Sequence, residues 1–149
     1  MAGIRRILHP SDFSKASGAA FAKAVDLAKS NRAELVLLHV LAPPIPIMAG
    51  DGYISPHVYE DLDKSARAYA SKELAGLVAK AKKAGVRANA VLRDGIAHEQ
   101  IARAARSPRT DMIVIGTHGR TGLAKLFLGS VAARVVSTAT CPVMTVRGK

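Results

Sequence analysis

The chain has 149 residues with a formal net charge of +11, and 49% of its residues are apolar against 22% charged. This balance is typical of one globular domain that is large enough to bury a core, which argues against a disordered chain. The single cysteine, Cys141, excludes an internal disulfide scaffold and favours a reducing compartment.

Positive charge lies at the N-terminus, but Pro10 and Asp12 interrupt the apolar stretch before a signal-peptide core can form. The longest near-continuous apolar run, residues 35–42, is far shorter than the roughly 20 residues of a membrane-spanning helix. We therefore expect a cytoplasmic protein without membrane contact.

The first third of the chain is predicted to form a strand, a helix and a second strand. Residues 4–8 form the first strand, and Ser14 suits the N-cap of a helix that ends near Ser30. Residues 34–40 include an unbroken run of large apolar side chains, which is typical of a parallel strand covered by helices on both faces.

Prolines and glycines dominate residues 43–56, which we interpret as a surface loop, with a lid or a partner-contact segment as the alternative. Apolar spacing then predicts a long amphipathic helix over residues 57–84, with Gly85 at its C-cap. The basic residues of this helix are expected to face water.

Two more strand and helix pairs and a last strand follow. The strands are predicted at residues 86–92, at residues 112–115 and from Pro142 to Val146, and the helices at residues 97–105 and from Gly129–Ser130 to about Thr138. Because crossovers between parallel strands are right-handed, this series predicts a three-layer α/β/α domain with a five-stranded, mostly parallel sheet over residues 1–149. Ligands of such open sheets bind beyond the carboxyl ends of the strands.

Candidate binding residues follow the first, second and fourth strands. Ser11 and Asp12 come after the first strand, and Val40 ends the second. Gly116, Gly119 and Gly122 let backbone N–H groups approach a ligand after the fourth strand. The helix that begins at Gly129–Ser130 offers free N–H groups and a dipole to a phosphate, with Arg120 and Lys125 as counter-charges. The two common phosphate-binding motifs, the P-loop and the dinucleotide fingerprint, are absent.

The spacing Gly116-x2-Gly119-x9-Gly129-Ser130 resembles the nucleotide-binding signature of the universal stress protein family. Three further segments match family patterns in the same order: residues 7–14 (Ile-Leu-x-Pro-x-Asp-x-Ser), residues 38–40 (Leu-His-Val) and residues 141–143 (Cys-Pro-Val). The resemblance covers the whole chain and places it in the ATP-binding class of single-domain members.

The resemblance implies an open sheet of strand order 3-2-1-4-5, of the adenine nucleotide alpha-hydrolase-like type. It assigns the ribose to Asp12 and Gly116, adenine to the backbone of Val40, and the phosphates to Gly119, Gly129 and Ser130. Val131 departs from relatives that carry a second hydroxyl residue there. The full predicted site is Pro10, Ser11, Asp12, Val40, Gly116, His118, Gly119, Arg120, Gly129, Ser130 and Val131. The resemblance also implies a homodimer through the strand from Pro142 to Val146.

The residues also have structural interpretations. Asp12 suits a turn or cap, the glycines suit a turn, and Ser130 suits an N-cap. Arg120 and Lys125 suit solvated charges, and His118 lacks a nucleophile or carboxylate placed beside it by any motif. Cys141 is expected to be buried rather than reactive. The histidines lack metal-ligand spacing, so any Mg²⁺ would be held mainly by phosphates.

Three functions remain open on these grounds. The first is a regulatory, stress-response protein that binds ATP or another adenine nucleotide with Mg²⁺. The second is a slow ATPase or self-phosphorylating enzyme, for which the sequence offers few groups, because no carboxylate follows Asp111. The third, a nucleic-acid-binding module, ranks last, because the basic residues from Lys64 to Arg109 are spread over several elements without a recognised motif.

Overall fold

A computed structural model describes residues 3–42, 55–106, 109–117 and 128–148. The observed elements are β1 (Arg6–Pro10), α1 (Ser17–Asn31), β2 (Glu34–Leu41), α2 (Pro56–Lys83), β3 (Ala88–Asp94), α3 (Ala97–Arg106), β4 (Met112–Gly116), α4 (Ser130–Thr138) and β5 (Val143–Val146). Every predicted helix and strand is present. β1 and β3 begin and end two residues later than predicted, because their ladders with β2 continue into residues whose polarity suggested a loop. Of the predicted loop, residues 43–54 lie outside the described residues.

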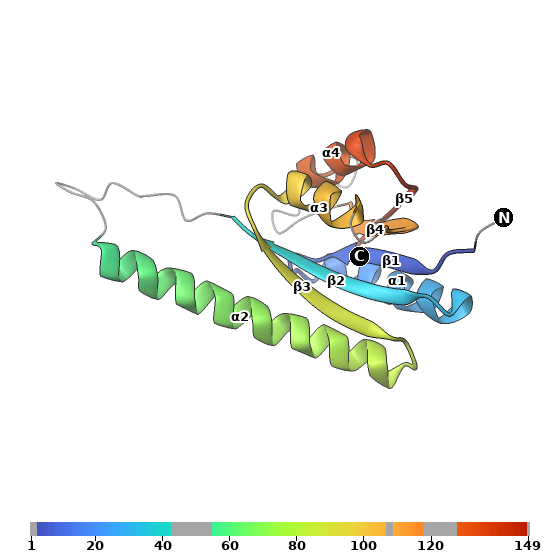
Figure 1. The fold of residues 1–149 in the computed structure, drawn as a ribbon, viewed down its shortest axis with the longest axis horizontal. Coiled ribbons are helices and arrows are strands. Elements are labelled where there is room, and N and C mark those ends of the chain that lie inside the picture. The colour runs from blue at the N-terminus through green and yellow to red at the C-terminus, as the bar shows by residue number, and fades with distance from the viewer. Residues whose placement is uncertain (1–2, 43–54, 107–108, 118–127, 149) are drawn as a thin grey trace.

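The strands form one parallel sheet of order β3-β2-β1-β4-β5, which confirms the expected order (Figure 1). β1 pairs with β2 on one side, where Arg6 lies opposite Glu34, and with β4 on the other, where Ile7 lies opposite Met112. The chain therefore leaves β1 in one direction to build β2 and β3, and returns to its other side to build β4 and β5. The strand order reverses between β1 and β4, which is where such sheets bind ligands.

Two hydrophobic clusters, one on each face of the sheet, give the fold its three layers. On one face, Ile7, Leu35 and Leu37 pack against small residues of α1, such as Ala24, and against Leu74 of α2. On the other face, the alternate residues of the same strands pack against α3 and α4; they include Leu8, Val36, Leu38, Ile113 and Ile115. Figure 1 shows α1 and α2 on one side and α3 and α4 on the other. The unbroken apolar run of β2 is thus buried on both faces, as predicted.

Helix α2 has a clear signal at each end. The Ser55 hydroxyl accepts a hydrogen bond from the Val58 N–H at 3.3 Å, and Pro56 occupies the first turn, where its missing N–H is harmless. The C-cap is Ala84 rather than the predicted Gly85, which follows it and takes a φ of 89°, the left-handed conformation that ends many helices. None of the helices in the described ranges has the length and apolar character needed to cross a membrane.

Two titratable side chains are held in their neutral forms by burial. His9 of β1 is completely buried, its Nδ1 lies 2.8 Å from the Val114 carbonyl oxygen, and its ring lies 6.0 Å from that of Phe21. Since a carbonyl only accepts, Nδ1 carries the proton, and Nε2 has no hydrogen-bond partner among the described residues. Burial lowers the pKa of His9 to about 4. The half-buried Cys141 has its thiol pKa raised, first by burial, which agrees with an unreactive role.

Candidate functional site

A pocket of about 330 Å³ lies where the strand order reverses, at the carboxyl ends of β1, β2 and β4. The loop after β1, the start of α3 and the start of α4 complete its walls. Its lining residues are Pro10, Ser11, Asp12, Ser17, Leu38, His39, Val40, Ala97, Ile101, Ile115, Gly116, Thr117, Gly129, Ser130, Val131 and Ala132.

The described part of the predicted site converges on this pocket. Its members there are Pro10, Ser11, Asp12, Val40, Gly116, Gly129, Ser130 and Val131. The other three predicted members, His118, Gly119 and Arg120, lie outside the described residues, as do Gly122 and Lys125. The structure therefore joins segments from the first and last thirds of the chain into one cavity.

Several lining residues were missed by sequence reasoning. Ala97 and Ile101 are four residues apart in α3, and this spacing resembles an ordinary core-facing helix stripe. Ser17 opens α1, and Thr117 directly follows the predicted Gly116. These residues could have been found from their positions in the predicted fold. α3 begins and β4 ends at the carboxyl edge of the sheet, which is the edge where ligands were expected.

The pocket lining combines apolar side chains with a helix N-terminus. Leu38, Val40, Ile101 and Ile115 form an apolar wall that suits a flat, weakly polar ring. The pocket is also lined by the start of α4, which begins at Ser130 after Gly129, a residue that has no side chain to cap the helix. The first-turn N–H groups of α4 and its dipole therefore present partial positive charge to the pocket.

The loop after β1 is folded by its own side chains. Asp12 Oδ1 accepts a hydrogen bond from the Ser14 N–H at 2.9 Å, so the turn interpretation of Asp12 holds. The Ser11 hydroxyl accepts from the Phe13 N–H at 3.1 Å. Ser14 Oγ accepts from the Ser17 N–H at 3.1 Å, which is the bond expected of a capping serine, but the prediction that α1 starts directly after Ser14 was wrong, because α1 begins only at Ser17.

Phe13, next to Asp12, adopts a strained backbone conformation that side-chain contacts hold in place. Its φ is 64°, a left-handed conformation that costs about 1–2 kcal/mol for a residue with a Cβ. Its ring stacks on His39 with the centroids 4.3 Å apart, and meets Tyr69 edge-on at 6.0 Å. His39 Nδ1 lies 2.7 Å from the Ser11 carbonyl oxygen and donates a hydrogen bond to it. His39 thus contacts the loop on both sides of Asp12.

The described residues offer few metal ligands. No group of three or more His, Cys, Asp or Glu side chains with suitable geometry occurs within the ranges that the structure describes. The oxygen ligands in the described lining are the Asp12 carboxylate and the hydroxyl groups of Ser11, Ser17, Thr117 and Ser130. This hard oxygen set suits Mg²⁺ only if another group supplies most of the coordination shell.

An open parallel sheet with helices on both faces and a pocket at its switch point defines a doubly wound α/β domain. The sequence model described as "Universal stress protein family" matches residues 3–147, so the chain belongs to that family.

Individual relatives agree with this assignment over nearly their full lengths. Universal stress protein YxiE of Bacillus subtilis is 32% identical over 145 residues, covering 95% of this chain and 98% of its own. The solved structure of universal stress protein UspA from Lactobacillus plantarum has a TM-score of 0.83 at 27% identity, covering 99% and 100% of the two chains. A universal stress protein family protein from Arabidopsis thaliana, solved with AMP bound, has a TM-score of 0.69 at 25% identity, covering 97% and 92%.

Proposed function

We propose that this protein is a regulatory, stress-response protein of the cytoplasm that binds ATP or another adenine nucleotide. The observation that carries the proposal is the pocket itself, which combines an apolar wall, a carboxylate and a helix N-terminus whose N-cap, Gly129, has no side chain, at the switch point. These groups match a base, a ribose and a phosphate chain respectively. The AMP-bound relative from Arabidopsis thaliana supports the same ligand class.

Each part of the nucleotide has a proposed contact. Adenine lies against the apolar wall and meets the backbone of Val40, while the ribose lies near Asp12 and Gly116. The phosphates lie at Gly129 and Ser130, where the dipole of α4 favours negative charge. Gly119 and Arg120 extend this phosphate site in the proposal, and Pro10, Ser11, His118 and Val131 border the nucleotide. Mg²⁺ bound with ATP would take most of its oxygen ligands from phosphate and water.

Replacing Asp12 by asparagine is expected to weaken nucleotide binding about ten- to hundredfold, because a charged acceptor for the ribose hydroxyls is lost. The asparagine side-chain oxygen can still accept from the Ser14 N–H, so the loop keeps its turn. Calorimetric titration with Mg-ATP and with AMP measures both affinities. A Lys64→Gln variant, changed on the exposed surface of α2, is the control and should bind like wild type. Unchanged affinity in Asp12→Asn would refute the ribose assignment.

Binding rather than catalysis is the proposed activity. Asp12 is the only carboxylate among the described lining residues, and its proposed role is ribose binding. Fast phosphoryl transfer needs both positioned metal ligands and a group that orients the nucleophile. The second candidate, slow ATP hydrolysis or self-phosphorylation, predicts phosphate release by wild type that disappears in Asp12→Asn. Release that survives this substitution would point to a contaminant.

The proposal includes a homodimer through the strand from Pro142 to Val146. β5 ends the sheet and pairs only with β4 among the described strands. The carbonyls of Pro142 and Val146 accept from Ile113 and Thr117, so the backbone groups of Thr145, which alternate with these, point to the open edge.

A Thr145→Pro variant is therefore expected to be monomeric, since it removes an N–H from the open edge while leaving the β4 ladder intact. Sedimentation would give wild type twice the 15.6 kDa chain mass and the variant one chain mass. Thr145→Val, which keeps the N–H, should remain dimeric. A dimeric Thr145→Pro would exclude this interface.

A further inference from the structure

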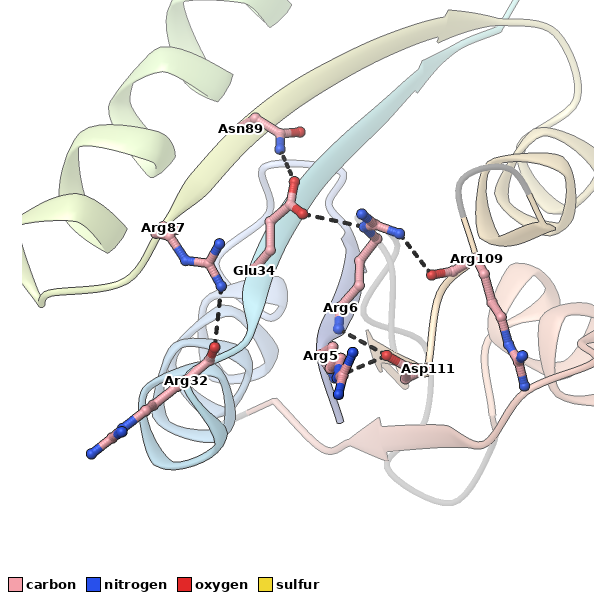
Figure 2. Close-up of polar contacts among 8 residues, drawn as sticks. All are labelled: Arg5, Arg6, Arg32, Glu34, Arg87, Asn89, Arg109 and Asp111. Atoms are coloured by element: carbon pink, nitrogen blue, oxygen red, sulfur yellow. Dashed lines mark hydrogen bonds and ion pairs between the residues drawn. The ribbon is translucent and has the colours of Figure 1, made fainter. Parts of the chain in front are cut away.

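Four adjacent strands begin side by side with an arginine at each start. Arg87 precedes β3, Arg32 precedes β2, Arg5 precedes β1, Arg6 is its first residue, and Arg109 precedes β4. We call these five residues the arginine row. Figure 2 shows them together around Glu34 and Asp111. They come from four separate parts of the sequence, which is why the basic residues looked scattered along the chain.

The row lies at the amino edge of the sheet, opposite the pocket, and the helix ends add to its charge. In a parallel sheet with helical crossovers, each helix ends near the edge where the next strand starts. The last turns of α1, α2 and α3 are basic and contain Lys29, Lys80, Lys82, Lys83, Arg103 and Arg106. Much of the net charge of the chain is therefore concentrated on one side of the molecule.

The two carboxylates in the row are already engaged. Asp111 accepts hydrogen bonds from the backbone N–H groups of Arg5 and Arg6 at 2.9 and 3.0 Å, which are the bonds that lower its pKa together with nearby Arg109 and Arg6 charges. Glu34 accepts from Arg6 Nε at 3.3 Å and from Asn89. These bonds hold Arg6 and the strand starts in place.

Three guanidinium groups remain available to an outside partner. Within the described ranges, no hydrogen bond or ion pair joins the side chains of Arg5, Arg32 or Arg109 to another residue. In Figure 2 the side chains of Arg32 and Arg109 extend away from the other residues drawn. Since neighbouring strands lie about 4.8 Å apart, the row is on the order of 15 Å long.

Guanidinium groups bind phosphate oxygens through paired N–H donors, so a row of them suits a polymer of phosphates. Arginine in protein interfaces usually accompanies a buried aromatic or apolar centre, and a protein partner is disfavoured because the exposed large hydrophobic side chains of the described residues are not in the row. The exposed large hydrophobic side chains of the described residues lie elsewhere, in the first half of α2 (Val58, Tyr59, Leu62, Tyr69), after β3 and β4 (Ile96, Leu128), and in α4 (Val131, Val136). The same lack of aromatic side chains disfavours base stacking on a single strand.

From these observations we infer that the arginine row binds the phosphate backbone of duplex nucleic acid without sequence preference. The inference gives nucleic-acid binding a higher rank than the sequence alone did, because the fold brings arginines from four segments to one edge. The inference does not depend on the nucleotide proposal, since the row and the pocket lie at opposite edges of the sheet.

Fluorescence anisotropy of a labelled DNA duplex of about 20 base pairs, titrated between about 50 and about 200 mM salt, tests this inference. Wild type should bind two unrelated duplex sequences equally, with a logarithmic salt slope of about −4, as expected for four to five phosphate contacts. In the triple variant Arg5→Gln/Arg32→Gln/Arg109→Gln, the magnitude of the salt slope should be smaller by about three. Its affinity for the duplex at low salt should be at least about tenfold weaker. Among the described residues the wild-type side chains of Arg5, Arg32 and Arg109 make no hydrogen bond or ion pair, and far-UV circular dichroism checks that the variant folds.

A control variant, Lys23→Gln/Lys64→Gln/Lys72→Gln, removes the same charge from exposed sites away from the amino edge and should retain the wild-type slope. Equal losses in the two triple variants would mean that bulk charge alone attracts DNA, and would overturn the inference. Displacement of DNA by an acidic peptide at equal charge concentration would also overturn it, in favour of an acidic protein partner. Stronger binding of one duplex sequence over the other would contradict backbone recognition.

Discussion

Replacing His39 by leucine is expected to weaken adenine nucleotide binding about tenfold to a hundredfold while leaving the protein folded. His39 donates a hydrogen bond to the Ser11 carbonyl and stacks on Phe13, so it holds both neighbours of Asp12. These contacts contribute about 1 kcal/mol each, which is comparable to the cost of the left-handed conformation of Phe13. Without them the loop would relax, and Asp12 would leave the position proposed for ribose binding.

Calorimetric titration with AMP and with 2′-deoxy-AMP measures this effect, because a positioning role acts on ribose recognition rather than on adenine. His39→Leu should lose any preference for the ribonucleotide together with its affinity. His39→Asn keeps an N–H donor close to the Nδ1 position and should recover part of both. The idea fails if His39→Leu binds both nucleotides like wild type. It also fails if the variant is unfolded at the temperature of the titration, because loss of the fold would then explain the loss of affinity.

Acidification from neutral pH to about pH 4 is expected to cost about 3 kcal/mol of unfolding free energy through His9 alone. The pKa of His9 falls from 6.5 in the unfolded chain to about 4 in the fold, because complete burial disfavours the imidazolium. Above pH 6.5 both states are neutral at this site and the stability is fully present. Between pH 6.5 and pH 4 only the unfolded state binds the proton, so stability falls throughout that window.

Urea unfolding at several pH values, compared between wild type and His9→Asn, isolates this contribution. The asparagine amide can donate to the Val114 carbonyl in place of Nδ1 but does not titrate. The variant is expected to be less stable at neutral pH, because it leaves unfilled space beside Phe21, and to lose about 3 kcal/mol less on acidification. Parallel pH profiles for the two proteins would show that His9 is not the group responsible.

The two edges of the sheet differ in the groups that they present, and the parallel topology explains both: one edge presents helix N–H groups and the other presents basic side chains. Carboxyl ends of parallel strands meet helix N-termini, so the pocket receives N–H groups and the positive end of the α4 dipole. Amino ends meet helix C-termini, whose dipoles favour the basic residues found there. A nucleotide and a phosphate polymer could therefore bind the same molecule without competing for residues.

Much of the pocket lining could be predicted because its residues stand at the ends of strands or at the start of a helix. Asp12, Gly116 and Ser130 each stand at a strand or helix end whose edge of the sheet was predictable from the alternating pattern. Ala97 and Ile101 could not be predicted, because an apolar pair four residues apart in a helix packs equally well into a core or a pocket wall. Ser14 misled the helix start because its hydroxyl caps the turn before α1 rather than the helix itself.

The sequence by itself determined the α/β class, the strand order through its family resemblance, and the loops that carry the pocket. Hydrophobic periodicity and turn residues depend only on residues that are close together in the sequence, so the sequence alone is enough to recognise them. Only the tertiary structure decided that Phe13 stacks on His39, that buried His9 has no partner for Nε2 among the described residues, and that arginines from four segments form one row. Each of these depends on which distant segments become neighbours in the sheet, and neighbouring strands such as β1 and β4 are separated by about a hundred residues of chain that no local pattern can bridge.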